Sequence, residues 1–394
     1  MSQPQSRLLD LLRQASARQI VAAPDGMMRG LADEREPFPF LAIVGHTEMK
    51  LALLLAVVNP RVGGVLLLGP RGTAKTTSVR ALVDVLPQVR HSLCPNGCTE
   101  EMLAAKGIAG ICQDCARKAG YGEPLTSLDR VRIVELPLNA RYEDVVGGIN
   151  ERLALEQQRV RLEKGLLAQA DQNILYIDEI NLLDPQIINA ILDAAAQGFF
   201  TVRRGPQKLT YWSRFLLIGS MNPEEGGLRP QIMDRFGLRV AVKGLADAAE
   251  RYQAYERSVR YQLDPDGLAA AFASEMLALA AEVEQAQARL NGVVVSRPGR
   301  ELGLGLIQEM GIASNRAEIA LFEAARAYAA IDERDEVTAA DVQLVAPLAL
   351  RLRRSPALDQ FFRELDLEDA RLQHASRLPA VPDTPEAPQS GQTP

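Results

Sequence analysis

The sequence predicts an α/β fold with a three-layer core, a parallel sheet, β-hairpin insertions and a C-terminal helical domain. Four short β-rich runs alternate with helical or loop segments, at 65–68, 131–136, 174–178 and 214–219. Such alternation is typical of a mainly parallel sheet with helices on its faces. After about Lys243 glycines become rare, and alanine-rich helical patterns continue to about Arg354. This part of the chain therefore predicts a separate helical bundle.

Helices and a hairpin are expected around these strands. Gly63 and Gly64 separate a helix at 48–59 from the first strand, and a second helix is expected at about 75–86. A β-hairpin is expected where two β-rich runs flank the turn-forming segment RRGPQ, at Phe199–Val202 and Lys208–Trp212.

The helical part shows two further patterns. One helix face is expected to carry the apolar residues Ile319, Phe322, Ala325 and Ala329. Another helix is expected to begin near Val337, with Thr338 as its N-cap.

The changes in composition divide the chain into four expected parts. These are an N-terminal extension at 1–36, the α/β core at 37–243, the helical domain at 244–356 and a C-terminal extension at 357–394. Five prolines within 377–394 predict that the last part ends in a disordered tail.

Composition and charge exclude several classes of protein. The chain has 394 residues, of which 47% are hydrophobic and 24% charged, with a net charge of −6. This charge is unfavourable for a protein dedicated to binding duplex DNA. The longest apolar run, Leu51–Val58, is shorter than the roughly 18 residues that a membrane span needs. The N-terminus has no apolar signal core, so we expect a cytoplasmic protein.

A candidate phosphate-binding loop follows the first strand and opens a helix. Small residues let backbone N–H groups surround phosphates at a helix N-terminus. Lys75 is expected to reach the β- and γ-phosphates, and the Thr76 hydroxyl to ligate Mg²⁺. Ala74 occupies a position where the general pattern has glycine, and its methyl group is tolerable there if φ is negative. The candidate nucleotide-binding residues are Gly69, Pro70, Arg71, Gly72, Thr73, Ala74, Lys75, Thr76 and Thr77.

Polar residues at the ends of two later strands complete a site for ATP hydrolysis. Asp178 ends the run at 174–178, and Glu179 follows it. Asp178 would hold Mg²⁺ through water, and Glu179 would polarise the attacking water. Asn222 follows the run at 214–219 and would orient water near the γ-phosphate. Arg235 would neutralise charge in the transition state of a neighbouring subunit, or would only pair with Asp234.

The sequence resembles the AAA+ ATPases, specifically the small ATPase subunit (subunit I) of magnesium chelatase and the related MoxR-like proteins. The likeness covers about residues 38–355. The segments that carry it are FPFLAIVGHTEMKLALLLAVVNPRVGGVLLLGPRGTAKT, YIDEINLLD, IGSMNPEEGGLRPQIMDRFGLRV and SNRAEIALFEAARAYAAIDERDEVTAADV. The Ala-Lys-Thr ending of the phosphate loop also occurs in this branch.

The resemblance implies a role for several residues. Ile43, Val44 and Gly45 would line the adenine pocket, and His46 stands where relatives have glutamine. Asn222 would be sensor 1, Arg235 the arginine finger that acts in trans, and Arg316 the sensor-2 arginine of the helical lid that contacts phosphate. The finger has a second candidate in Arg229, and hairpin insertions would lie at about 142–165 and 199–212.

The resemblance also implies an activity and an assembly. Members form homo-oligomeric rings, normally hexamers, that bind ATP and Mg²⁺. They drive insertion of Mg²⁺ into protoporphyrin IX in (bacterio)chlorophyll biosynthesis. Their partners are a middle subunit with an integrin-like (VWA) domain and a large porphyrin-binding subunit.

Three other functions use the same motifs. A MoxR-like chaperone would remodel another VWA protein. A ring motor acting on nucleic acid would contact the backbone through Arg203, Arg204 and Lys208, although the acidic charge disfavours it. A nucleotide-binding scaffold would bind ATP without turnover.

All four cysteines of the chain lie in an insertion expected at 91–120. They form two pairs, Cys94 with Cys98 and Cys112 with Cys115, and glycines near both pairs favour turns. Two such pairs are typical of a tetrahedral structural Zn²⁺ site. An iron–sulfur cluster, a thiol redox switch and unliganded cysteines are the alternatives.

Overall fold

The computed structural model describes residues 7–17, 37–94, 96–148, 164–204, 207–354 and 367. Residues 1–353 form one compact unit, and 354–394 form a second. The predicted α/β class is confirmed within the first unit. The boundary predicted near residue 243 stays a prediction.

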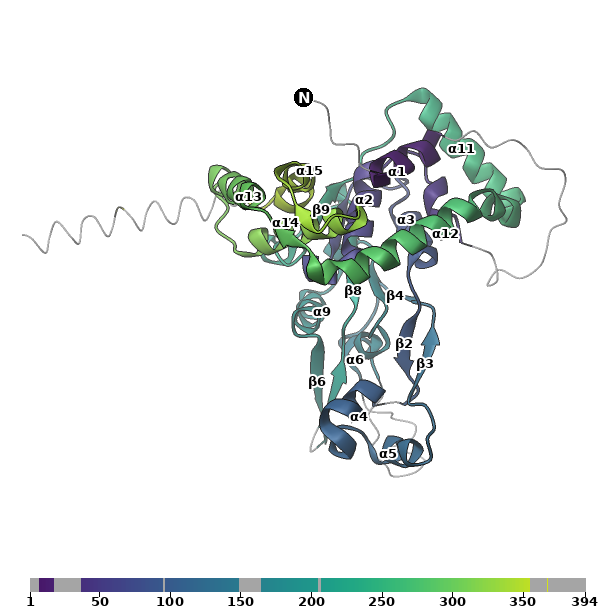
Figure 1. The fold of residues 1–394 in the computed structure, drawn as a ribbon, viewed down its shortest axis with the longest axis vertical. Helices are drawn as coiled ribbons and strands as arrows, with labels where there is room; N and C mark the ends of the chain where they lie inside the picture. The colour runs from purple at the N-terminus through teal and green to yellow at the C-terminus, as the bar shows by residue number, and fades with distance from the viewer. Residues whose placement is uncertain are drawn as a thin grey trace, which may run out of the picture. The chain divides into compact units, whose positions relative to one another are not determined.

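The core of the first unit is a five-stranded parallel sheet (Figure 1). Its strands, in spatial order, are β4 (Ile133–Glu135), β5 (Ile174–Ile177), β8 (Leu216–Met221), β1 (Val65–Leu68) and β9 (Leu238–Ala241). Four of them were expected from apolar runs. β9 was not, because the buried Arg239 interrupts its apolar pattern.

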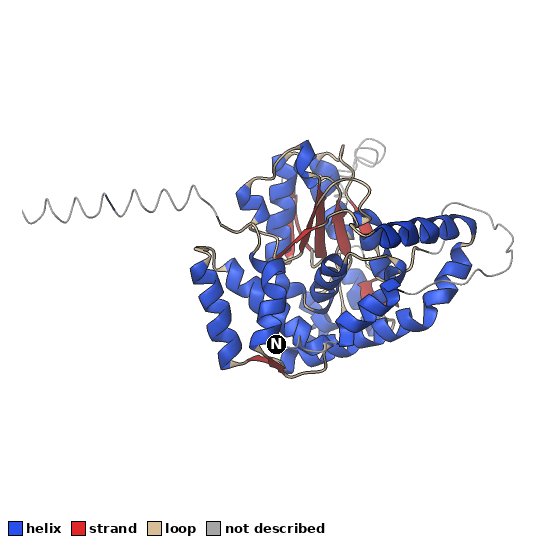
Figure 2. Ribbon diagram, turned by 90° about the horizontal axis from the view of Figure 1, so that it is seen from above, coloured by secondary structure: helices blue, strands red, loops and turns tan. Residues whose placement is uncertain are grey.

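Helices cover both faces of the sheet, as Figure 2 shows. In β1, Val65 and Leu67 belong to one buried cluster, together with the helices α2 (Thr47–Val58) and α14 (Arg316–Ile331). The alternate residues Leu66 and Leu68 belong to a second cluster, with α9 (Pro185–Gln197). Alternate side chains of a strand point to opposite faces, so β1 is buried on both sides.

The two helices expected in the core are present. Thr47–Val58 corresponds to the helix expected at 48–59. The helix expected at 75–86 is α3 (Lys75–Ala81), which continues as the 3₁₀ turn η3 (Leu82–Val85). The N-terminal helix α1 (Arg7–Ala17) packs against α2 through the buried Leu8 and Leu12.

Two antiparallel ribbons project from the core toward a small helical module (Figure 1). The expected hairpin is confirmed and consists of β6 (Phe199–Arg204) and β7 (Gln207–Trp212). The second ribbon, β2 (Val89–Ser92) with β3 (Thr126–Asp129), was not expected. It carries the four cysteines and the helices α4 (Glu100–Lys106) and α5 (Gln113–Gly120), of which α5 contains Cys115.

The hairpin expected at 142–165 lies mostly outside the described residues. Its first part is a short helix, α6 (Tyr142–Val146), so this end of the expected hairpin was wrong. The chain is described again from Lys164, before the short helix α8 (Leu166–Gln169).

The C-terminal half is helical, as expected. Its helices besides α14 are α11 (Ala248–Leu263), α12 (Pro265–Arg289), α13 (Arg297–Glu309) and α15 (Ala339–Leu350). A two-stranded parallel pair links them, β10 (Val294–Val295) with β11 (Glu336–Val337). No helix in the described ranges has the length and apolar character that a membrane span requires.

Two local predictions for these helices have different outcomes. Thr338 caps α15 in a capping box with Asp341, as expected. On α14, Ala325 and Ala329 are buried, but Ile319 is 55% exposed. Ile319 lies on the first turn of α14, beside a surface cavity, so the predicted apolar face does not extend to it.

Candidate functional site

The phosphate loop turns between β1 and α3 at the carboxyl edge of the sheet. Gly69 is required there because a Cβ at this position would lie 2.0 Å from the carbonyl oxygen of Val242. The loop, the end of β5 and the end of β8 enclose a cavity of about 200 Å³. Its lining residues are Arg71, Gly72, Thr73, Ala74, Lys75, Thr76, Thr77, Asp178, Glu179, Ser220, Met221 and Asn222. Most of the residues expected to bind phosphate are therefore brought together.

Lys75 is held inside the loop that it follows. Its Nζ donates hydrogen bonds of 2.7 Å to the carbonyl oxygens of both Gly69 and Pro70. Burial lowers the pKa of Lys75, and the carboxylates of Asp178, Glu179 and Glu225 oppose this shift. The ammonium is therefore attracted by three carboxylates, of which Asp178 and Glu179 line the same cavity.

Ala74 adopts a backbone conformation that its side chain disfavours. Its φ is +59°, so the negative φ under which its methyl group was expected to be tolerable is absent. This left-handed conformation is the reason that the general pattern has glycine here. The chain keeps the turn and stores backbone strain at the start of α3.

Asp178 lies at the centre of a hydrogen-bond network at the end of β5. Thr76 Oγ1 donates to Asp178 Oδ2 at 3.2 Å, and Tyr176 donates to Oδ1 at 3.0 Å. Ser220 Oγ also donates to Oδ1. Thr76 and Asp178 thus present a hydroxyl and a carboxylate side by side. Both are oxygen ligands of the kind that Mg²⁺ prefers.

Sequence reasoning missed Tyr176 and Ser220. Burial raises the pKa of Tyr176 to about 12, so its hydroxyl stays protonated and donates to Asp178. Each residue lies two positions before a predicted site residue on its strand, Asp178 or Asn222. This period-two spacing is the signal that could have identified them.

Glu179 and Asn222 flank the cavity at the ends of β5 and β8. Glu179 has a φ of +50°, and its backbone N–H donates to Ser220 Oγ. Its carboxylate pairs with Arg71 at 2.8 Å. Asn222 is 5% exposed, and its Oδ1 accepts a hydrogen bond from the Glu224 backbone.

The residues expected to surround adenine lie next to a second cavity. Ile43 and Val44 are each 4% exposed and line none of the cavities described here. A cavity of about 470 Å³ begins at His46, two residues after Val44, and extends to Leu245 and Glu250. The adenine role of Ile43, Val44 and Gly45 stays a prediction.

A buried lysine, Lys50, supports this segment and was not anticipated. Its Nζ donates to the carbonyl oxygen of Ile43 at 2.8 Å and to Ser16 Oγ at 3.0 Å. Burial, with the nearby Arg257 guanidinium, lowers the pKa of Lys50 to about 7, although Glu250 opposes the shift.

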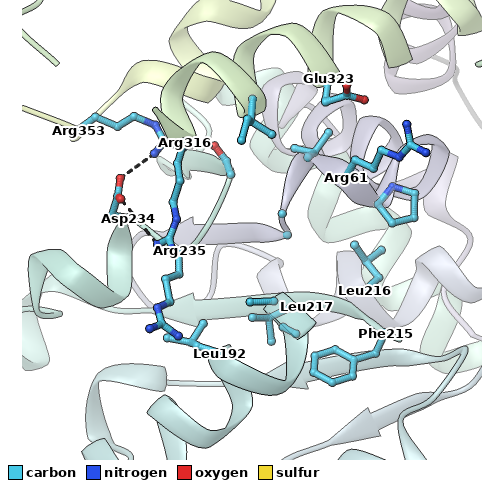
Figure 3. Close-up of a pocket in the computed structure, with 18 residues that line it drawn as sticks. Arg61, Leu192, Phe215, Leu216, Leu217, Asp234, Arg235, Arg316, Glu323 and Arg353 are labelled. Atoms are coloured by element: carbon cyan, nitrogen blue, oxygen red, sulfur yellow. Dashed lines mark hydrogen bonds and ion pairs between the residues drawn. The ribbon is translucent and has the colours of Figure 1, made fainter. Parts of the chain in front are cut away.

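Two of the three arginines expected to contact phosphate lie at the opposite edge of the sheet. Arg235 and Arg316 line a cavity of about 520 Å³ that also contacts Gly64 and Phe215, at the amino ends of β1 and β8 (Figure 3). Arg316 therefore does not reach the phosphate cavity of its own chain. The third arginine, Arg229, is exposed and lines neither cavity.

Arg235 does not pair with Asp234, which was the alternative reading of its role. It pairs with Asp193 of α9 at 2.5 Å. Asp234 instead accepts from the fully buried Arg353 at 2.8 Å and lies 3.8 Å from Arg316 (Figure 3). Both Arg235 and Arg316 keep part of their side chains exposed, at 31% and 48%.

The four cysteine sulfurs converge in the module carried by β2 and β3. All four Sγ atoms lie within 4.8 Å of one another, and the distance between Cys94 Sγ and Cys112 Sγ is 3.9 Å. Two backbone N–H groups donate to these sulfurs, from Asn96 to Cys94 and from Cys112 to Cys98. Leu125, Leu103 and Ile111 pack around them.

Comparisons with known proteins match both halves of the chain. The family model "Magnesium chelatase, subunit ChlI" matches residues 150–237, and "AAA lid domain" matches residues 305–374. A crystal structure from Cytophaga hutchinsonii is 20% identical and covers 79% of this chain and 83% of its own, with a TM-score of 0.51. These findings confirm the predicted AAA+ fold with a C-terminal helical lid.

Several curated relatives are similar over most of their length. The magnesium-chelatase subunit ChlI homolog of Methanocaldococcus jannaschii is 42% identical, covering 81% of this chain and 86% of the relative. The magnesium-chelatase 38 kDa subunit of Acidiphilium rubrum is 41% identical, with 81% and 92% covered. The magnesium-chelatase subunit ChlI-2 of Arabidopsis thaliana is 39% identical, with 82% and 77% covered.

We expect Ala74→Gly to stabilise the protein by about 0.5–1 kcal/mol, because glycine adopts the left-handed conformation without strain. Gly72→Ala is the matched control, with a φ of +77° and open space around the added methyl group. It should destabilise the fold by a similar amount. Chemical denaturation measures both changes, and a loss of stability in Ala74→Gly would contradict the strain at this position.

Proposed function

Because the chain belongs to the family of magnesium chelatase ATPase subunits I, a branch of the AAA+ ATPases, we propose that it powers insertion of Mg²⁺ into protoporphyrin IX in (bacterio)chlorophyll biosynthesis. The observation that carries the proposal is the cavity where Lys75, Thr76, Asp178 and Glu179 meet. It places a cation, a hydroxyl and two carboxylates at the carboxyl edge of a parallel sheet, where phosphate-binding loops lie.

The proposal assigns a task to the phosphate loop and to seven residues in or beside the cavity. The backbone of the phosphate loop and Lys75 bind the β- and γ-phosphates of ATP. Thr76 and Asp178 would hold Mg²⁺, which supplies positive charge to the phosphates when bound. Tyr176 and Ser220 orient Asp178 by donating to Oδ1. Glu179 polarises the attacking water, and Asn222 orients it.

The opposite edge would serve the site of a neighbouring copy. Arg235 and Arg316 are partly exposed and lie far along the strands from their own phosphate loop. In a ring of identical subunits, the amino edge of one sheet can face the carboxyl edge of the next. Both arginines then neutralise charge that develops on a neighbour's phosphates. A hexameric ring, acting in the cytoplasm, is part of the proposal.

The partners in this proposal are those of the family. A middle subunit with a VWA domain would dock on the ring, and a large subunit would hold the porphyrin. ATP hydrolysis would move the lid and the projecting ribbons, so that mechanical work reaches the partners.

A structural Zn²⁺ would hold the cysteine module in the same motor. Tetrahedral zinc with Zn–S distances of about 2.3 Å separates its sulfurs by about 3.8 Å. The 3.9 Å between Cys94 and Cys112 agrees with this value, and the four-thiol donor set suits zinc. Two of the sulfurs, those of Cys94 and Cys98, also accept hydrogen bonds from backbone N–H groups. The four residues therefore fit the ion.

We expect Glu179→Gln to abolish turnover and keep ATP binding. Loss of the water-polarising group should lower the rate of ATP hydrolysis at least about 100-fold. The test is reconstitution with the middle and large subunits of the same organism, ATP and protoporphyrin, followed by the Mg-porphyrin absorbance. Wild type and the exposed control Glu309→Gln should form product, and Glu179→Gln should not. Product formation by Glu179→Gln, or none by wild type, would contradict the proposal.

Metal analysis tests the cysteine module separately. We expect the purified chain to carry about one zinc per molecule, and the double variant Cys112→Ser with Cys115→Ser to carry almost none. Ser127→Ala, an exposed change on β3 of the same ribbon, should keep the zinc. Iron with visible absorbance, or four reactive thiols without metal, would show that the zinc assignment is wrong.

A further inference from the structure

One arginine at the rim of the phosphate cavity contacts two acids at once. Arg71 Nη2 lies 2.8 Å from Glu179 Oε1 and 2.7 Å from Glu225 Oε1. Glu179 follows β5, and Glu225 ends the 3₁₀ turn η6 (Pro223–Glu225) after β8. One guanidinium thus links the phosphate loop to two strand ends. Since Arg71 is 70% exposed, these ion pairs contribute little to folding stability. Their effect is on where the carboxylates lie.

The second acid restricts the guanidinium that Glu179 contacts. Arg71 has a long, exposed side chain, and such a side chain has many rotamers when nothing holds it. Glu179 and Glu225 both lie within ion-pair distance of the same Nη2 atom, so Glu225 fixes that atom beside Glu179. The position of the Glu179 carboxylate therefore depends on Glu225.

Glu225 also differs from its neighbour in burial. Its Oε2 is buried and has no hydrogen-bond partner among the described residues. A buried carboxylate oxygen without a donor is unfavourable, so stability alone gives no reason for an acid at this position. The adjacent Glu224 is exposed, and neither acid lines the phosphate cavity.

We propose that Glu225 is a positioning residue for ATP hydrolysis. It acts through Arg71 to hold the Glu179 carboxylate where that carboxylate polarises the attacking water. In this step the water oxygen bonds to the γ-phosphorus, and the bond between the γ-phosphorus and the oxygen that bridges it to the β-phosphate breaks. The electron pair of that bond stays on ADP, and the water proton passes by way of Glu179 to the released phosphate. The inference rests on the proposed function and adds a residue to it.

Steady-state ATP hydrolysis by Glu225→Gln tests this role. We expect kcat to fall about tenfold or more, because a small displacement of a catalytic group has effects of this size. The KM for ATP should stay within about twofold, since Glu225 does not line the cavity. The matched control Glu224→Gln should keep the kcat of wild type. Thermal unfolding midpoints of both variants should equal that of wild type.

A double-mutant cycle tests whether Glu225 acts through Arg71. In an Arg71→Ala background, Glu225→Gln should cause no further loss of kcat. Three results would overturn the inference. The first is an undiminished loss of kcat in the Arg71→Ala background. The others are a wild-type kcat in Glu225→Gln alone, or a loss of kcat accompanied by a lower unfolding midpoint. If the wild-type chain hydrolyses ATP and Glu225→Gln does so at the same rate, only this inference is contradicted and the proposed function stands. No hydrolysis by wild type contradicts the proposed function itself.

Discussion

The parallel pairing of β1 with β8, and of β8 with β5, is the constraint on which the site depends. It sets Leu68 beside Met221 and Ile177 beside Gly219. The residues that follow these strands then emerge at one edge of the sheet. The phosphate loop, Asp178 and Asn222 meet there although the chain separates them widely. The Thr76–Asp178 hydrogen bond is the direct consequence of this register.

The same sheet separates two sets of charged groups. Its carboxyl edge carries the loop and the acids, and its amino edge carries Arg235 and Arg316. Asp234 and the buried Arg353 connect the start of α14 to this second edge. One chain thus presents a phosphate cavity at one end of its strands and partly exposed cationic groups at the other. Identical copies in a ring would combine the two.

The sequence was most informative where burial alone decides structure. β1 could be predicted because all four of its residues are apolar, and a continuous apolar run is typical of a parallel strand buried on both faces. β9 could not be predicted, because it contains the buried Arg239. The guanidinium of Arg239 donates to the carbonyl oxygens of Met233 and Leu352, and only the tertiary structure provides these contacts. The ribbon of β2 and β3 was missed because it has no buried apolar run: Thr126 is its one buried residue, and the others are partly buried or exposed.

The site shows the same division. The phosphate loop, Asp178 and Glu179 follow from motif and strand position, whereas the partner of Arg235 does not. Asp193 is forty-two residues away and reaches Arg235 only because α9 packs beside α10 (Pro230–Met233). The sign of φ at Ala74 was expected wrongly, although the glycine that the general pattern has at this position indicates a left-handed conformation.

The central claim is that ATP is hydrolysed between adjacent copies of the chain. Mixing two inactive variants, Glu179→Gln and Arg235→Ala, tests it most directly. In a mixed ring, some interfaces combine an intact Glu179 from one copy with an intact Arg235 from the other. The account predicts that ATP hydrolysis reappears on mixing, to a fraction of the wild-type rate that depends on the mixing ratio. A mixture as inactive as its two components, despite forming mixed rings, would contradict it.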